Sequence, residues 1–194
     1  MQTPYDPIAD EWHAAPRNFG ARKYVELILG GLAHGARVLD VGCGTGEPIA
    51  RYAAERGFRV VCVDESERML EIARRVVPGA EFVRAGMCEM SLDGGFAAAI
   101  AWDSVFHVAR GRHREVFRKL YGLLDPGGRL LLSAGGSGHE GFTSEMYGRA
   151  FFYSAHDPAE TVRLLTEEGF VVELCEEDDP SSRGHIAVVA RKPV

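Results

Sequence analysis

A run of apolar residues that ends in three alternate glycines, Val38-Leu39-Asp40-Val41-Gly42-Cys43-Gly44-Thr45-Gly46, constrains the fold of this chain more than any other feature. The apolar part has the length of a buried strand. The glycines allow positive φ and let the backbone come close to a ligand. Open α/β sheets hold nucleotide-like ligands where such a strand turns into a helix. We therefore expect a sheet with a ligand at this turn.

Two carboxylates restrict the type of ligand. The dinucleotide-binding pattern G-x-G-x-x-G would place a glycine at position 47, but the chain has Glu47, which would repel a pyrophosphate at the helix N-terminus. About twenty residues further on, an apolar strand ends in Asp64, which is placed to accept hydrogen bonds from two ribose hydroxyls. The sequence thus favours a cofactor that has a ribose and no pyrophosphate.

Helix and strand patterns alternate along the rest of the chain, which predicts a parallel sheet covered on both faces. Ser66 is a candidate N-cap, and the polar segment 178–184 is short enough to join the last two strands as a hairpin. The expected helices are 7–13, a helix with Tyr24, Leu27, Ile28 and Leu32 on one face, 47–56, 66–76, 112–124 and 157–168; the expected strands are 37–41, 58–64, 81–84, 96–102, 129–134, 170–176 and 186–191.

Four segments, in this order and spacing, resemble those of class I S-adenosylmethionine-dependent methyltransferases: VLDVGCGTGEP at 38–48, VVCVDESERMLEIAR at 60–74, AWDSVFHV at 101–108 and LLDPGGRLLLSAG at 123–135. The third is similar to that of a subgroup of small bacterial methyltransferases. The resemblance implies S-adenosylmethionine as the cofactor. It also implies an α/β fold with a Rossmann-like, doubly wound, mostly parallel seven-stranded sheet whose last strand is antiparallel. The methyl acceptor is left open.

The resemblance also implies which residues bind the cofactor. Asp40 holds the glycine turn or the amino-acid part of the cofactor, and Asp64 binds the ribose. Gly86 stands where relatives commonly carry an aspartate for the adenine amino group, so either backbone groups of the next two residues hold the adenine edge or cofactor affinity is lower than usual. The complete set of expected cofactor-binding residues is Asp40, Gly42, Gly44, Gly46, Asp64, Met69, Met87, Cys88 and Trp102. Met69 and Trp102 are equally compatible with core positions.

Methyl transfer is an in-line displacement, so alignment of the acceptor and exclusion of water do most of the work. A hydroxyl acceptor would also need a base. His107 is the candidate base, and Asp103, four residues earlier, is expected to orient its ring. The expected acceptor-side residues are Tyr5, Trp12, Phe106 and Tyr153. His139, His156 and His185 are too dispersed in the sequence to predict a metal site.

Length, composition and charge restrict the remaining possibilities. The 194 residues, 46% of them hydrophobic, can form one substantial core, so we expect a single domain over 1–194. Within it, 1–34 is expected to form a helical cover and 135–154 a lid on the acceptor side. The formal net charge of −6 argues against a nucleic-acid partner. Neither a leader pattern nor an apolar run of membrane length is present, and the cysteines lack C-x-x-C spacing, which predicts a cytoplasmic protein without membrane partner or disulfide framework.

The sequence therefore predicts methylation of a small molecule at oxygen or nitrogen. Aromatic residues near the expected rim suit a small apolar or aromatic acceptor. Two alternatives stay open. The chain could bind S-adenosylmethionine or S-adenosylhomocysteine without catalysis, or it could be a nicotinamide-dependent oxidoreductase, against which Glu47 and the segment at 123–135 count.

Overall fold

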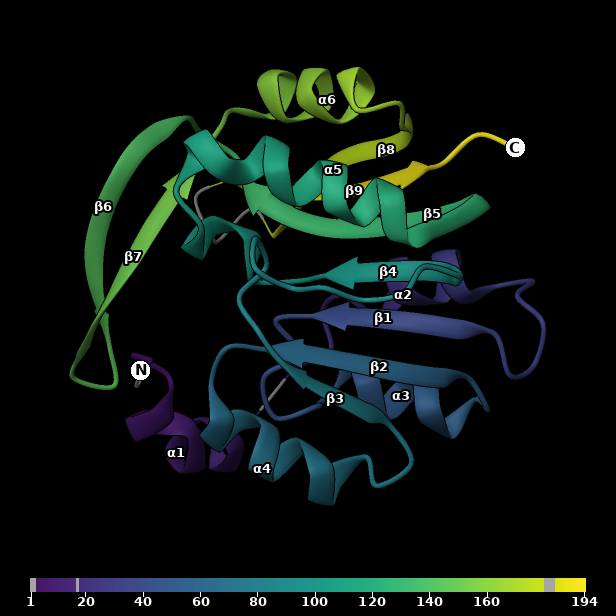
Figure 1. Cartoon of the computed structure of the whole chain (residues 1–194). Helices are drawn as coiled ribbons and strands as arrows, with labels where there is room; N and C mark the ends of the chain where they lie inside the picture. The colour runs from purple at the N-terminus through teal and green to yellow at the C-terminus, as the bar shows by residue number, and fades with distance from the viewer. Residues whose placement is uncertain (1–2, 17, 180–183) are drawn as a thin grey trace.

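A computed structural model describes residues 3–16, 18–179 and 184–194. Within them, seven strands form one sheet in the order β3-β2-β1-β4-β5-β9-β8 (Figure 1). Every pairing from β3 to β5 is parallel, and β9 runs antiparallel to both β5 and β8. The predicted doubly wound sheet with an antiparallel last strand is confirmed. The strands are β1 (Arg37–Val41), β2 (Arg59–Asp64), β3 (Glu81–Arg84), β4 (Phe96–Ala101), β5 (Leu124–Gly135), β8 (Val171–Asp179) and β9 (His185–Arg191).

Helices cover both faces of the sheet because each strand sends alternate apolar side chains to opposite sides. On one face, Leu39 of β1 and Leu130 of β5 pack in a cluster that includes residues of α5 (His113–Leu123) and α6 (Pro158–Glu167). On the other face, the cluster includes residues of α2 (Arg22–Leu29), α3 (Ile49–Glu55) and α4 (Glu67–Val76). These two apolar layers fix the strand ends that carry the polar residues of the site.

The N-terminal segment is anchored on α4. It consists of a 3-10 turn, Asp6–Ile8, and the short helix α1, Ala9–Ala14. The Asp6 carboxylate accepts a hydrogen bond from Ser66 Oγ at 2.7 Å, while Ser66 Oγ accepts one from the backbone N–H of Met69, which confirms Ser66 as the N-cap of α4. The predicted cover 1–34 is therefore divided, because α2 lies in the core against the sheet and only the residues before it reach the ligand-binding end.

The segment 135–154, predicted as a lid-forming loop, instead contains most of a hairpin of two strands, β6 (His139–Met146) and β7 (Arg149–Ala155). Sequence patterning missed it because most β6 side chains are exposed, so β6 shows no apolar alternation. Its turn has positive φ at Tyr147 (50°) and Gly148 (67°), as in two-residue hairpin turns of type I′. Asparagine or aspartate is usual at the first of these positions, so the tyrosine hid the signal.

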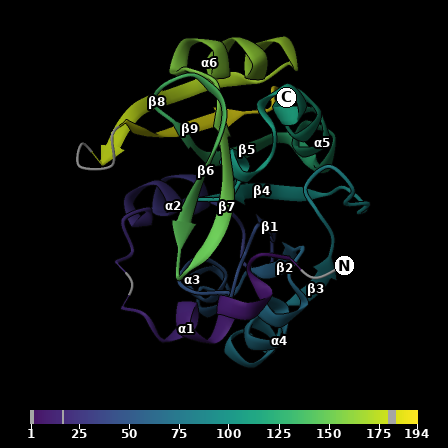
Figure 2. The same cartoon turned by 90° about the vertical axis from the view of Figure 1, so that its left-hand side faces the viewer.

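The hairpin extends past the carboxyl ends of the strands. Figure 1 shows β1, β2 and β4 pointing toward the end of the molecule where α1 and the hairpin lie. Figure 2, which looks onto that end, shows β6 and β7 running in front of the sheet toward α1. At the contact, the ring centroids of Trp12 and Tyr147 are 6.2 Å apart. The expected hairpin loop between the last two strands lies largely outside the described residues, at 180–183.

Candidate functional site

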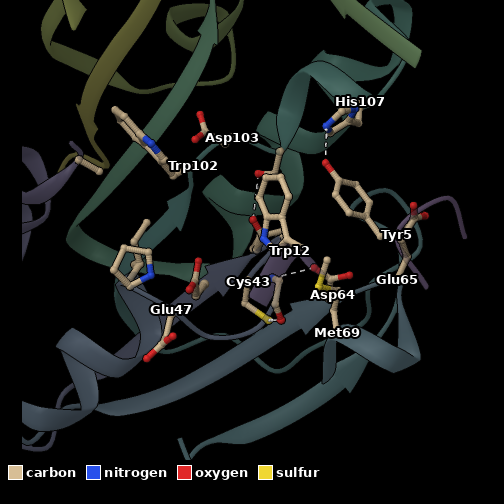
Figure 3. Close-up of a pocket in the computed structure, with 18 of the residues that line it drawn as sticks. Tyr5, Trp12, Cys43, Glu47, Asp64, Glu65, Met69, Trp102, Asp103 and His107 are labelled. Atoms are coloured by element: carbon tan, nitrogen blue, oxygen red, sulfur yellow. Dashed lines mark hydrogen bonds between the residues drawn. The ribbon is translucent and has the colours of Figure 1, made fainter. Parts of the chain in front are cut away.

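A cavity of about 370 Å³ lies at the carboxyl ends of β1, β2 and β4 (Figure 3). This is where open α/β sheets bind their ligands. Its floor comes from the glycine turn after β1, and the side walls come from the residues that follow β2, β3 and β4. The N-terminal segment and the hairpin tip add aromatic rings. Of the residues predicted to form the site, the cavity is lined by Tyr5, Trp12, Asp40, Gly42, Gly44, Asp64, Met69, Met87, Trp102, Asp103 and His107.

The three glycines of the turn have different roles. All three have positive φ, but a Cβ at Gly44 (φ 54°) would find no atom nearer than Trp12 Nε1 at 4.0 Å, so this position opens into the cavity. A Cβ at Gly42 would lie 2.4 Å from Ser104 Cβ, and one at Gly46 would lie 3.1 Å from Val77. Gly46 does not line the cavity. Of the three glycines predicted to bind the cofactor, Gly42 and Gly44 thus line the cavity, and Gly46 packs instead against Ala73 of α4.

Two buried aspartates organise the turn. The Asp64 carboxylate accepts hydrogen bonds from the backbone N–H groups of Gly44 and Ser66, both at 2.9 Å. Burial raises the pKa of Asp64 to about 6 in spite of these bonds. Burial, together with the charge of Asp64, raises the pKa of Asp40 to about 7, and Asp40 accepts a hydrogen bond from the Ala50 N–H in α3. Each Asp64 oxygen accepts one N–H and retains a free lone pair for a ribose hydroxyl.

The end of the cavity beyond Asp64 combines apolar side chains with one carboxylate that the sequence did not reveal. Met69 and Met87 line it, whereas Cys88 is buried in the core behind and does not. Two carboxylates lie near the place of a Cβ at Gly86, where the resemblance places an aspartate: Glu89 Oε2 at 2.5 Å and Glu65 Oε2 at 4.0 Å. Of these two, Glu65 lines the cavity and Glu89 does not, so Glu65 is the carboxylate that a ligand there can reach. Sequence analysis passed over it because Asp64, beside it, already explained the strand end.

His107 is held at the cavity wall by two hydrogen bonds. Its Nδ1 donates to the Phe152 carbonyl of β7 at 2.8 Å, and its Nε2 accepts from the Tyr5 hydroxyl at 2.8 Å (Figure 3). A carbonyl accepts only, so the proton resides on Nδ1 and the lone pair on Nε2. Burial lowers the pKa of His107 below its usual value of 6.5, which keeps the ring neutral near pH 7. A neutral imidazole at the cavity wall can accept a proton.

Asp103 does not orient His107, contrary to the prediction. Its carboxylate lies 2.9 Å from Nε2 of His185, and Ser133 Oγ donates to it at 3.3 Å. The reason is local geometry, because Asp103 has a φ of 52° and the residues after it form a 3-10 turn, Val105–His107, so the expected helical spacing is absent. The Phe152 carbonyl has the orienting role instead.

The predicted acceptor-side aromatic residues divide into two groups. Tyr5 and Trp12 line the cavity, as does Tyr147 at the hairpin tip. Phe106 and Tyr153 do not line it. They stack on each other with ring centroids 5.8 Å apart and support His107 from behind, 4.9 Å and 4.8 Å from its ring. The prediction that these two residues contact the substrate is therefore corrected, because their rings hold the His107 ring instead.

The metal-ligating side chains are dispersed over the fold. Among the described residues, no group of three or more His, Cys, Asp or Glu side chains is arranged to hold a metal ion. The thiols of Cys43, Cys62, Cys88 and Cys175 are free, and the first three are buried. In the same part of the chain, no helix combines the length and the apolar content that crossing a bilayer requires.

Comparison with known proteins agrees with this geometry. Residues 38–128 match the family model of a methyltransferase domain. YqeM of Bacillus subtilis is 35% identical over 115 residues, which are 56% of this chain and 46% of YqeM. The chain spans less than half the length of the first curated relatives that it matches.

Two solved methyltransferases share the fold. The CcbJ methyltransferase of Streptomyces caelestis superposes with a TM-score of 0.80 over 100% of this chain and 99% of its own, at 19% identity. The 1,6-didemethyltoxoflavin-N1-methyltransferase of Burkholderia thailandensis superposes with a TM-score of 0.74 over 98% of this chain and 84% of its own, at 23% identity. Residues 38–128 therefore match a methyltransferase domain, and the fold of the chain is the one that these two methyltransferases share.

Proposed function

We propose that this protein transfers the methyl group of S-adenosylmethionine to a small molecule, at oxygen or nitrogen. The observation that carries the proposal is the position of His107, a neutral imidazole whose Nε2 accepts a hydrogen bond from the Tyr5 hydroxyl at the wall of the cavity that also holds the glycine turn and Asp64. The volume of about 370 Å³ is at the low end for small-molecule sites, so a polymer cannot enter whole.

The residues of the cavity fit the cofactor part by part. We propose that Asp64 binds the ribose hydroxyls and that Glu65 accepts a hydrogen bond from the adenine amino group, with Met69 and Met87 against the ring. When bound, the cofactor supplies an electrophilic methyl group on a sulfonium. The open face of Gly44 gives the ligand close access to the backbone.

The chain's own residues handle the acceptor proton. The Tyr5 hydroxyl donates to Nε2 of His107 and lines the cavity, so it can receive the acceptor proton while it passes its own proton to Nε2. The acceptor lone pair then forms the new bond to the methyl carbon, and the carbon–sulfur bond electrons remain on sulfur. Trp12 and Tyr147 close the cavity from opposite sides and exclude water.

Replacement of Asp64 by alanine is expected to weaken cofactor binding by about 2–4 kcal/mol, because hydrogen bonds to charged groups contribute roughly 1.5–3 kcal/mol each and do not add fully. Since Asp64 also holds the Gly44 N–H, titration calorimetry is performed with two ligands, S-adenosylhomocysteine and an analogue without ribose hydroxyls. The wild type should prefer the former, and the variant should lose the preference. An equal loss of affinity for both ligands would assign Asp64 to the turn alone.

Turnover itself separates an enzyme from a non-catalytic binder of the cofactor. The expected result is formation of S-adenosylhomocysteine that depends on an added small molecule, measured by coupled homocysteine release. Cofactor binding without such release for any small molecule, together with methylation of a tRNA or a protein, would overturn the proposed acceptor class.

A further inference from the structure

The charged side chains of the cavity are all of one sign among the described residues. Five carboxylates line it, and no lysine or arginine does: Asp40, Glu47, Asp64, Glu65 and Asp103. Four of them already have a role or a partner. Asp40 and Asp64 hold the turn, Glu65 lies at the adenine end, and Glu47 pairs with Arg51 at 2.7 Å. Asp103 has a partner too, His185, but more than half of its side chain is exposed, so Asp103 remains accessible to the acceptor.

Asp103 is fixed at the cavity wall by a cluster of charges outside the cavity. His185 lies between two carboxylates, with Nε2 2.9 Å from Asp103 and Nδ1 2.6 Å from Asp178. Burial alone would lower the pKa of His185, but the hydrogen bonds and charges of both aspartates raise it above 6.5. With His185 protonated, the three side chains retain one net negative charge. It is accessible at Asp103, whose side chain is 57% exposed against 9% for Asp178.

Aromatic rings surround the same space. Trp102 follows β4 directly before Asp103, and Tyr5, Trp12 and Tyr147 complete the wall. The faces of such rings attract cations, and rings combined with a carboxylate are the usual surroundings of a bound ammonium group. A carboxylate acceptor would instead meet the net negative charge that this cluster retains, and no lysine or arginine among the described lining residues would offset it.

We propose that the acceptor of this site is an amine that enters as an ammonium ion, held by the Asp103 carboxylate between the aromatic rings. The proposal rests on the proposed function and narrows it from oxygen or nitrogen to nitrogen. One N–H proton leaves through the Tyr5 hydroxyl to His107 Nε2. The freed lone pair forms the nitrogen–carbon bond as the carbon–sulfur bond breaks, with its electrons left on sulfur. The product is a methylated ammonium ion.

The test measures binding of matched ligands with S-adenosylhomocysteine bound, so that no reaction occurs. Phenethylamine, 2-phenylethanol and phenylacetate share a ring and differ in charge, and similar triplets on other ring scaffolds extend the series. Calorimetry should rank the amines about tenfold or more above the alcohols, with the carboxylates weakest. Arg17 lies outside the described residues and follows the lining residue Pro16 in the chain. Carboxylates are included because an arginine attracts them, so the series measures their affinity directly.

The variant Asp103→Asn should lower amine affinity by about 10- to 100-fold and leave alcohol affinity unchanged, since hydrogen bonds to a charged group contribute a factor of this size. Asparagine tolerates positive φ as aspartate does, and the melting temperature verifies the fold. The matched control is Asp125→Asn, an exposed carboxylate at the opposite end of the sheet, which should change neither affinity.

Three results would overturn the amine proposal while leaving methyl transfer intact: no amine binding at millimolar concentration, alcohols or carboxylates that bind more tightly than amines, or unchanged amine affinity in Asp103→Asn. Failure of S-adenosylhomocysteine to bind in the first titration would count against the proposed function instead. The two failures are thus distinguishable.

Discussion

Replacement of His107 by alanine is expected to lower the turnover rate by about a hundredfold to ten-thousandfold, with cofactor affinity nearly unchanged. The Nε2 of the imidazole accepts a hydrogen bond from the Tyr5 hydroxyl at 2.8 Å, and this hydroxyl connects it to the acceptor space. Removal of the base raises the barrier to the proton-coupled step and leaves the glycine turn intact. Single-turnover kinetics and calorimetry measure the two quantities separately.

The comparison variant Tyr5→Phe removes only the hydroxyl. It keeps the ring, whose centroid lies 4.7 Å from that of Phe151 and 6.0 Å from that of Trp12. If the proton travels through that hydroxyl, this variant should also lose turnover. A fall of only two- or threefold in His107→Ala would instead show that positioning of the reactants accounts for the whole rate. In that case His107 would be a structural residue of the cavity wall.

The pH dependence of turnover should have an acid limb below pH 6.5. The neutral form of His107 is the active one, and burial lowers the pKa of the ring, so activity is retained down to a lower pH than for a free imidazole. As the pH falls through that pKa, the ring becomes protonated and turnover falls. A pH profile of kcat for the wild type and His107→Ala tests this, because the limb should be absent from the variant.

The second large effect is expected at the glycine turn, where Gly44→Val should abolish cofactor binding in a domain that still folds. The added Cβ would point into the open part of the cavity, and branching there would fill the space that the ligand needs. Valine at a φ of 54° also strains the backbone, which lowers stability without removing the core. Circular dichroism and calorimetry measure the two effects.

Gly35→Val is the matched control for that strain. Gly35 has a φ of 77°, no atom lies within 4 Å of the place that a Cβ would take, and it precedes β1 at the other end of the sheet. It should lose similar stability and bind the cofactor normally. Gly42→Val is unsuitable for comparison, because its Cβ would lie 2.4 Å from that of Ser104. Retained binding in Gly44→Val would mean that the ligand does not lie on this turn.

The sequence alone determined which segments form the sheet and at which end of it the glycine turn lies. Local patterns were sufficient there, because a buried parallel strand is a short apolar run and its ligand-binding turn requires glycine within the next few residues. Asp64 and Ser66 follow the same logic, since a strand end and a helix N-cap are each defined by neighbours in the chain. The strand end at Asp64 and the N-cap at Ser66 are confirmed, and the role of Asp64 at the ribose stays a prediction.

The acceptor side depended on tertiary structure, because its contacts join residues far apart in the chain. Tyr5 meets His107 across 102 positions, and Asp103 finds its partner in His185 instead of the nearby histidine. The hairpin was also missed, since its exposed strand β6 carries no apolar alternation. Sequence spacing reports on side chains that share an element. Which side chains meet across the cavity was decided by the order of the strands and the path of the hairpin over their ends.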